Sequence, residues 1–124
     1  MARRVTPVTR LARLWSVLDG GKTMLIVMQN NPDPDAIAAA AALRMIANEI
    51  HGISCSIAHA GAVGRAENVA LLDYLRLNTR ELETLDLDRF DRIGMVDAQP
   101  GAGNVNFDPS VRLDVVIDLS LIHI

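Results

Sequence analysis

A chain of 124 residues is long enough for one domain with a modest core. Half of its residues are hydrophobic but only 3% are aromatic, so aliphatic side chains must build that core. The net charge of −3 argues against a general polyanion-binding surface, and the single cysteine, Cys55, excludes an internal disulfide. No apolar run approaches the ~20 residues of a membrane span, and no hydrophobic signal region follows the N-terminus. These features predict a cytoplasmic protein that does not interact with membranes.

The first half of the chain alternates between helix-forming and strand-forming segments. Pro7–Leu18 has hydrophobic side chains at helical spacing, with Trp15 as the expected anchor, and Gly20–Gly21 should end this helix. The apolar run Thr23–Met28 predicts a buried strand. The Ala-rich run after it predicts a helix from Asp35 to about Ile50.

The second half continues this alternation. Ile53–Ala58 predicts a strand, Glu67–Leu77 a helix, and the acidic segment Glu81–Asp88 a short helix or turn. Arg92–Val96 and Val111–Ile117 predict two further strands. The expected fold class is therefore α/β, with a mainly parallel, Rossmann-like sheet flanked by helices.

An acidic motif connects the first strand to the Ala-rich helix. The stretch Gln29–Asp35 reads Gln-Asn-Asn-Pro-Asp-Pro-Asp, so a proline separates Asp33 from Asp35. One interpretation is structural, because prolines enforce an extended turn and Asp35 can cap the helix. A cap does not explain Asp33, and two carboxylates so close repel each other unless a cation neutralises them. Both interpretations remain open for the motif alone.

Two other predicted strands are also followed by an aspartate. Asp97 stands after Arg92–Val96, and Asp118 stands after the last strand. The carboxyl ends of parallel strands share one edge of the sheet, so these residues should converge with Asp33 and Asp35. Such a carboxylate cluster favours Mg²⁺ or Mn²⁺, and a pair of these ions is a common device for phosphoester hydrolysis.

Three segments resemble the motifs of the DHH phosphoesterase superfamily, over about residues 22–118. Asn31–Ile37 resembles the first motif, Val96–Pro100 the second, and Val115–Asp118 the beginning of the third. The resemblance implies a hydrolase with two Mn²⁺ ions, Mg²⁺ being an alternative, that acts on nucleotides, short oligonucleotides or polyphosphate. By the same resemblance Asp33, Asp35, Asp97 and Asp118 would be metal ligands, Asp97 and Asp118 would be catalytic, and Asp97 would bridge the two ions. A homodimer is also compatible with it.

The chain departs from this family pattern at two places. Gln29 occupies the position of a usual histidine ligand, which should weaken one metal site. No His-His pair follows Asp118, and the usual second, substrate-binding domain is not in the sequence. We therefore expect residues 1–118 to be an incomplete DHH-like catalytic domain. Residues 119–124 resemble translated read-through and would form a doubtful tail on an inactive fragment.

Two other function classes compete with the hydrolase. The departures suggest a non-catalytic regulatory or assembly module of the same fold, with an incomplete metal site. A nucleotide binder without metal is disfavoured, because Gly101–Gly103 is only part of a dinucleotide-binding fingerprint. His59 is a weak candidate for an extra ligand, and Arg65 for a phosphate contact.

Overall fold

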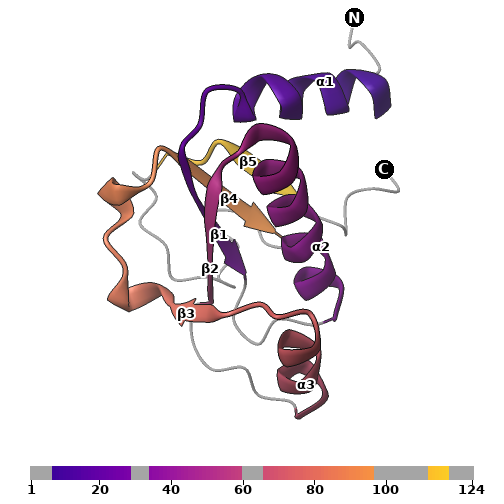
Figure 1. Ribbon diagram of the computed structural model, residues 1–124, viewed down its shortest axis with the longest axis vertical. Helices are drawn as coiled ribbons and strands as arrows, with labels where there is room; N and C mark the ends of the chain where they lie inside the picture. The colour runs from indigo at the N-terminus through magenta and orange to yellow at the C-terminus, as the bar shows by residue number, and fades with distance from the viewer. Residues whose placement is uncertain (1–6, 29–33, 60–65, 97–111, 118–124) are drawn as a thin grey trace, which may run out of the picture.

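Five parallel strands form a single sheet in the computed structural model, which describes residues 7–28, 34–59, 66–96 and 112–117 (Figure 1). The strands are β1 Thr23–Met28, β2 Ser54–His59, β3 Thr79–Glu81, β4 Arg92–Val96 and β5 Val115–Ile117. Their order across the sheet is β3-β2-β1-β4-β5, and each neighbouring pair is parallel. The predicted α/β fold with a mainly parallel sheet is confirmed.

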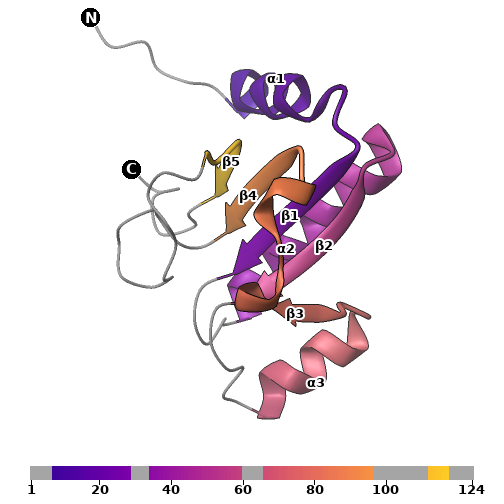
Figure 2. The ribbon, with the colours of Figure 1, turned by 90° about the vertical axis from the view of Figure 1, so that its left-hand side faces the viewer.

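Helices cover one face of this sheet, and a short irregular segment covers the other (Figures 1 and 2). The helices are α1 Pro7–Leu18, α2 Pro34–Met45 and α3 Ala66–Tyr74. A π-helical turn, Ile46–Ile50, extends α2. The opposite face packs against the connection between β3 and β4, which contains the 3₁₀ turns Leu82–Thr84 and Leu87–Arg89.

The central strand β1 is buried on both faces, and this explains its uninterrupted apolar sequence. Met24, Ile26 and Met28 pack on the helical side, whereas Leu25 and Val27 pack on the other side. All five side chains are fully buried. A strand in the middle of a doubly covered sheet needs no polar face, so its residues do not alternate in polarity.

Helix α1 is attached to the sheet by hydrogen bonds as well as by apolar contact. The Arg92 guanidinium donates to the backbone carbonyls of Val17, at 2.7 Å, and of Asp19, at 3.1 Å. Leu18 is fully buried, whereas Trp15 is 39% exposed and packs edge-on against His51 with ring centroids 4.9 Å apart. The expected anchoring role of Trp15 therefore belongs mainly to Leu18.

Several predicted boundaries need correction. The second strand lies one residue later than predicted, and the helix expected over Glu67–Leu77 is observed as Ala66–Tyr74. The acidic segment after it does contain short helical turns, but the three-residue strand β3 precedes them and was not predicted. The last strand begins only at Val115 in the described residues. No helix in the described ranges is both long enough and apolar enough to cross a membrane.

Candidate metal centre

The last residues of the strands form one row across the sheet. Met28 lies opposite His59 on one side and opposite Val96 on the other, and Val96 lies opposite Ile117. Neighbouring strands of a sheet are about 4.8 Å apart. Strands β1, β4 and β5 therefore end side by side, at the same level.

This edge also contains the point where the strand order reverses. The chain places β2 and β3 on one side of β1, and β4 and β5 on the other side. In open α/β sheets, ligands bind outside the carboxyl ends of the strands at such a reversal. Here the reversal lies between β1 and β4, whose following segments begin the motifs that contain Asp33 and Asp97.

Of the four predicted ligands, the structure describes Asp35. This residue lies in the first turn of α2 and its side chain is exposed. Because α2 begins at Pro34, Asp35 is the second residue of the helix, two residues beyond the capping position that the sequence predicted for it. A negative charge in the first turn is stabilised by the positive end of the helix dipole. The position of Asp35 therefore does not by itself indicate a metal ion.

The other three predicted ligands, Asp33, Asp97 and Asp118, lie outside the described residues, as do Gln29 and Arg65. Within the described ranges, no group of three or more histidine, cysteine, aspartate or glutamate side chains could hold a metal ion. His59 belongs to the row at the strand ends, and Glu81 of β3 lies opposite it. The metal centre thus remains a prediction, and the structure describes only the ends of the strands that precede Asp33, Asp97 and Asp118.

Helix α2 lies close to the sheet because β4 has a glycine beneath it. A Cβ atom at Gly94 would lie 2.8 Å from Met24 Cε and 3.3 Å from Leu43 Cδ2. Both neighbours are buried in the core between α2 and the sheet. The missing side chain therefore fixes the height of α2 above the sheet, and with it the position of Asp35 relative to the strand ends.

Strand β5 is held in register by a buried carboxylate that the sequence did not single out. Asp114 Oδ2 accepts a hydrogen bond from the Ile93 amide at 2.9 Å, while the Asp114 amide donates to the Ile93 carbonyl at 2.8 Å. Its other oxygen lies 2.9 Å from Arg112 Nη2, and the Asp114 side chain is only 6% exposed. These contacts fix the register of β5 on β4, and Asp114 lies four residues before Asp118 in the sequence.

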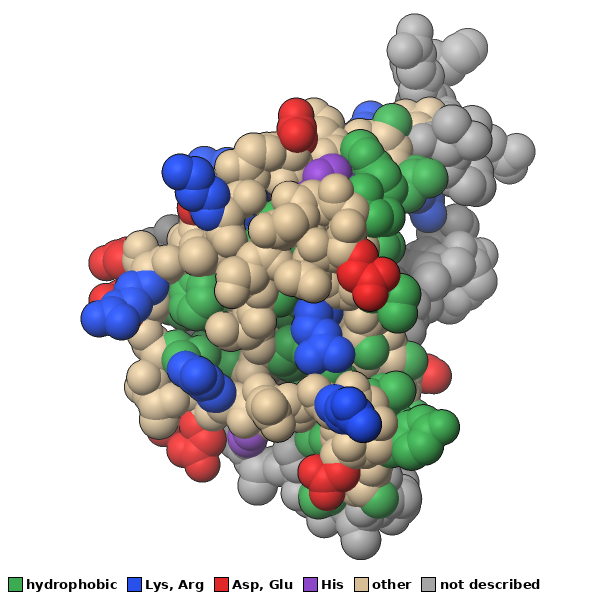
Figure 3. Space-filling model, in the orientation of Figure 1, with side chains coloured by type: hydrophobic (Ala, Val, Ile, Leu, Met, Phe, Trp, Pro, Cys, Tyr) green, Lys and Arg blue, Asp and Glu red, His purple; other side chains and the backbone are tan. Residues whose placement is uncertain are grey.

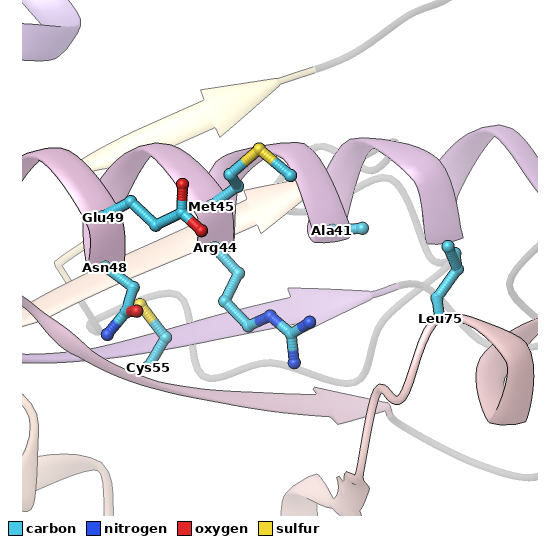
Figure 4. Close-up of a pocket in the computed structure, with 7 residues that line it drawn as sticks. All are labelled: Ala41, Arg44, Met45, Asn48, Glu49, Cys55 and Leu75. Atoms are coloured by element: carbon cyan, nitrogen blue, oxygen red, sulfur yellow. The ribbon is translucent and has the colours of Figure 1, made fainter.

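A concavity on the helical side of the sheet, which we call the α2 groove, was also missed (Figure 4). It has a volume of about 420 Å³ and is lined by Ala41, Arg44, Met45, Asn48, Glu49, Cys55 and Leu75. Burial raises the pKa of the Cys55 thiol above its ordinary value of 9.0, although the charge of Arg44 opposes this shift. No motif in the sequence indicates this groove, because its residues come from three separate segments.

Charged side chains are dispersed over the face shown in Figure 3, with Lys and Arg alternating with Asp and Glu. This distribution agrees with the small negative net charge. Among the described residues on this face, Lys and Arg side chains do not form one continuous basic surface of the kind that binds a long nucleic acid.

Comparison with known proteins identifies a relative but no family. The chain is 36% identical over 95 residues to the uncharacterized protein MJ1633 of Methanocaldococcus jannaschii. The match covers 77% of this chain and 19% of the relative, so the chain spans about a fifth of that protein's length. No protein-family model and no solved structure matches the chain. The fold and the edge described above define an α/β protein with a parallel sheet.

Proposed function

We propose that this chain is part of a metal-dependent phosphoester hydrolase of the DHH type, with Mn²⁺ as its ion and Mg²⁺ as an alternative. The observation that carries the proposal is the alignment of the strand ends. Met28, Val96 and Ile117 end three adjacent strands at the same level. Each of these strands is followed by an aspartate of a motif that resembles the DHH superfamily.

The sheet order supports different roles for these aspartates. Strand β4 lies between β1 and β5, so Asp97 follows the middle strand of the three. It is therefore the best candidate to contact two ions at once. Asp33 and Asp35 would then hold one ion from the β1 side, and Asp118 the other from the β5 side. Carboxylate oxygens are the ligands that Mn²⁺ and Mg²⁺ prefer, so the donor set fits these ions.

In this proposal the chain places negatively charged carboxylates where they can hold the metal ions, and a helix end where it can attract phosphate. Bound ions would neutralise phosphate charge, activate water and stabilise the leaving oxygen. The carboxylates would hold the ions, and Asp97 and Asp118 are the residues proposed to be catalytic. The amino end of α2, which begins beside the carboxyl end of β1, adds a partial positive charge that favours a bound phosphate group (Figure 1).

The proposed substrates are small phosphate-containing molecules or short oligonucleotides. The small negative net charge of the chain supports a short substrate over a long polyanion. As part of the same proposal, a second domain of a longer protein binds the substrate, and the protein acts in the cytoplasm. The relative, of which this chain covers a fifth, has the length for further domains.

Binding of Mn²⁺ to the whole chain, followed by electron paramagnetic resonance, tests the proposal. Asp97→Asn should weaken binding by about tenfold or more, because it removes the charge of a direct ligand. Asp19→Asn is the matched control, since Asp19 is an exposed acid next to the amino edge of the sheet. Equal binding by the Asp97→Asn variant and the wild type would refute the assignment. Absence of Mn²⁺ binding in the wild type would favour the non-catalytic module instead.

A further inference from the structure

The α2 groove is separate from the edge that carries the aspartate motifs. Cys55, on its wall, is the second residue of β2 and lies opposite Met24, four residues before the row of strand ends. The volume of the groove, about 420 Å³, is within the range of small-ligand sites. One wall of the groove is apolar, with Ala41 and Leu75, and the other carries the polar side chains of Arg44 and Asn48 (Figure 4).

Arg44 is the main charged donor in this groove. Its Nη1 atom donates to the Arg76 carbonyl at 3.4 Å, which directs the side chain away from α2. Glu49 lines the same groove, yet no ion pair joins it to Arg44, and no other described carboxylate pairs with that guanidinium. Since a guanidinium has five N–H donors in a planar fork, most of them are available for a bound oxyanion.

The turn that holds Arg44 contains an unusual backbone conformation. Arg76 has φ of +55°, in the left-handed region where a residue with a side chain is uncommon. The turn is closed by a 2.9 Å hydrogen bond from the Leu77 amide to the Leu72 carbonyl, in a pattern that usually places glycine at this position. Arg76 therefore occupies the left-handed position of a cap at the carboxyl end of α3. The Arg76 carbonyl accepts the hydrogen bond that orients the Arg44 side chain.

The edge of β2 adds a backbone donor next to the groove. The Ser54 amide donates to the Lys22 carbonyl on the β1 side, so the N–H of Cys55 faces away from β1. Strand β3 pairs with β2 only from Ile57 onward. Within the described residues, the outer edge at Cys55 is therefore not covered by a strand.

We propose that the α2 groove is a second binding site, for a small organic oxyanion with an apolar body. The ligand would place a carboxylate or phosphate monoester group on Arg44 and its apolar part against Leu75 and Ala41. This site is independent of the metal centre, because it lies near the opposite end of β2. It neither requires a metal nor predicts hydrolysis of the ligand.

Cys55 provides a direct reporter, since it is the only cysteine in the chain and lines the groove. The experiment measures its alkylation by N-ethylmaleimide, a neutral reagent, with phenyl phosphate, benzoate or benzyl alcohol present. Either oxyanion should slow alkylation several-fold in the wild-type chain, and calorimetric titration should give the same affinity. Benzyl alcohol, which has the same ring without the charge, should protect Cys55 much less.

Substitutions assign the effect to Arg44. Arg44→Gln should weaken oxyanion binding about tenfold or more, as expected for a lost charge-assisted hydrogen bond. Arg44→Lys keeps the charge without the fork and should have an intermediate effect. Arg80→Gln is the matched control, because Arg80 lies opposite Ala58, whose side chain packs on the other face of the sheet. Circular dichroism establishes that each variant is folded, and rates are compared with and without ligand within each variant.

Three results would overturn the proposal. The first is that neither oxyanion binds at millimolar concentration. The second is that benzyl alcohol protects Cys55 from alkylation as well as the oxyanions do. The third is that the folded Arg44→Gln variant binds the oxyanions with the same affinity as the wild type. Binding of phenyl phosphate alone would identify the ligand class as phosphate esters, and binding of benzoate alone would identify carboxylates.

Discussion

Gly94→Val should destabilise the protein because Gly94 sets the distance between α2 and the sheet. A Cβ at this position already lies 3.3 Å from Leu43 Cδ2 and 3.6 Å from Val115 Cβ, before the two valine methyl groups are added. Met24 Cε, at 2.8 Å, ends a flexible side chain and can move, whereas Leu43 is 1% exposed and surrounded by the core. Overpacking of this kind costs about 1–3 kcal/mol.

Removing a glycine from a strand has an opposing effect, worth about 0.5–1 kcal/mol in favour of the folded state. From the midpoints of these two ranges, the expected net loss for Gly94→Val is about 1 kcal/mol in the free energy of unfolding. Gly94→Ala should cost less, because displacement of the Met24 methyl group relieves the closest contact. Urea unfolding, followed by circular dichroism and Trp15 fluorescence, measures these differences at constant m-value.

A double-mutant cycle tests whether the clash is the one described. Leu43→Ala alone should cost about 2–5 kcal/mol, but less in the Gly94→Val background, where the added methyl groups occupy part of the cavity. Ser54→Val, at an exposed strand position, is the control and should change stability by less than about 0.5 kcal/mol. A stable Gly94→Val variant, or strictly additive effects of the two core substitutions, would show that Gly94 does not determine this packing.

Three further predictions concern contacts outside the α2–sheet core. Arg92→Met should lower the free energy of unfolding by about 1–3 kcal/mol, because it removes the charged donor that holds the end of α1 at the Val17 carbonyl; an unchanged urea midpoint would contradict this. Asp114→Ala should cost a similar amount by leaving the Ile93 amide without its acceptor, whereas Asp114→Asn should cost less. The raised pKa of Cys55 predicts that alkylation has its alkaline midpoint above 9.0 in the folded chain and near 9.0 in urea. Because the folded state favours the neutral thiol, this contribution to stability is complete below pH 9.0 and is lost as pH rises through the raised pKa; Cys55→Ser should abolish that part of the pH dependence.

The sequence predicted best the elements whose burial makes their pattern unambiguous. The bounds of Thr23–Met28 and Arg92–Val96 agree with the structure because both strands are short apolar runs buried on two faces. The helix before β1 agrees as well, since its hydrophobic spacing and the glycine that follows it mark both ends. These features are local, so a local pattern is sufficient to find them.

The elements that were missed depend on contacts distant in sequence. Strand β3 is three residues of Thr-Arg-Glu, and it is a strand only because β2 offers an edge for pairing. Arg76 adopts a left-handed turn without glycine, so no composition signal marks it. Contacts between distant segments also limit the prediction of sites. Motif order predicted an acidic edge, and the register of the strands is compatible with it. The α2 groove could not be predicted, because packing assembles it from separate segments.

We propose that metal ions bind at the carboxyl edge of β1, β4 and β5, and one measurement tests this directly. Because Mn²⁺ broadens NMR signals of nearby nuclei, titration of ¹⁵N-labelled chain with substoichiometric Mn²⁺ locates the ion. Residues at the two ends of β1, Thr23 and Met28, are about 17 Å apart at 3.3 Å per residue. We expect early loss of the amide signals of Met28, Val96 and Ile117, with those of Thr23 and Arg92 retained. Broadening centred on Thr23 and Arg92, or no selective broadening, would contradict it.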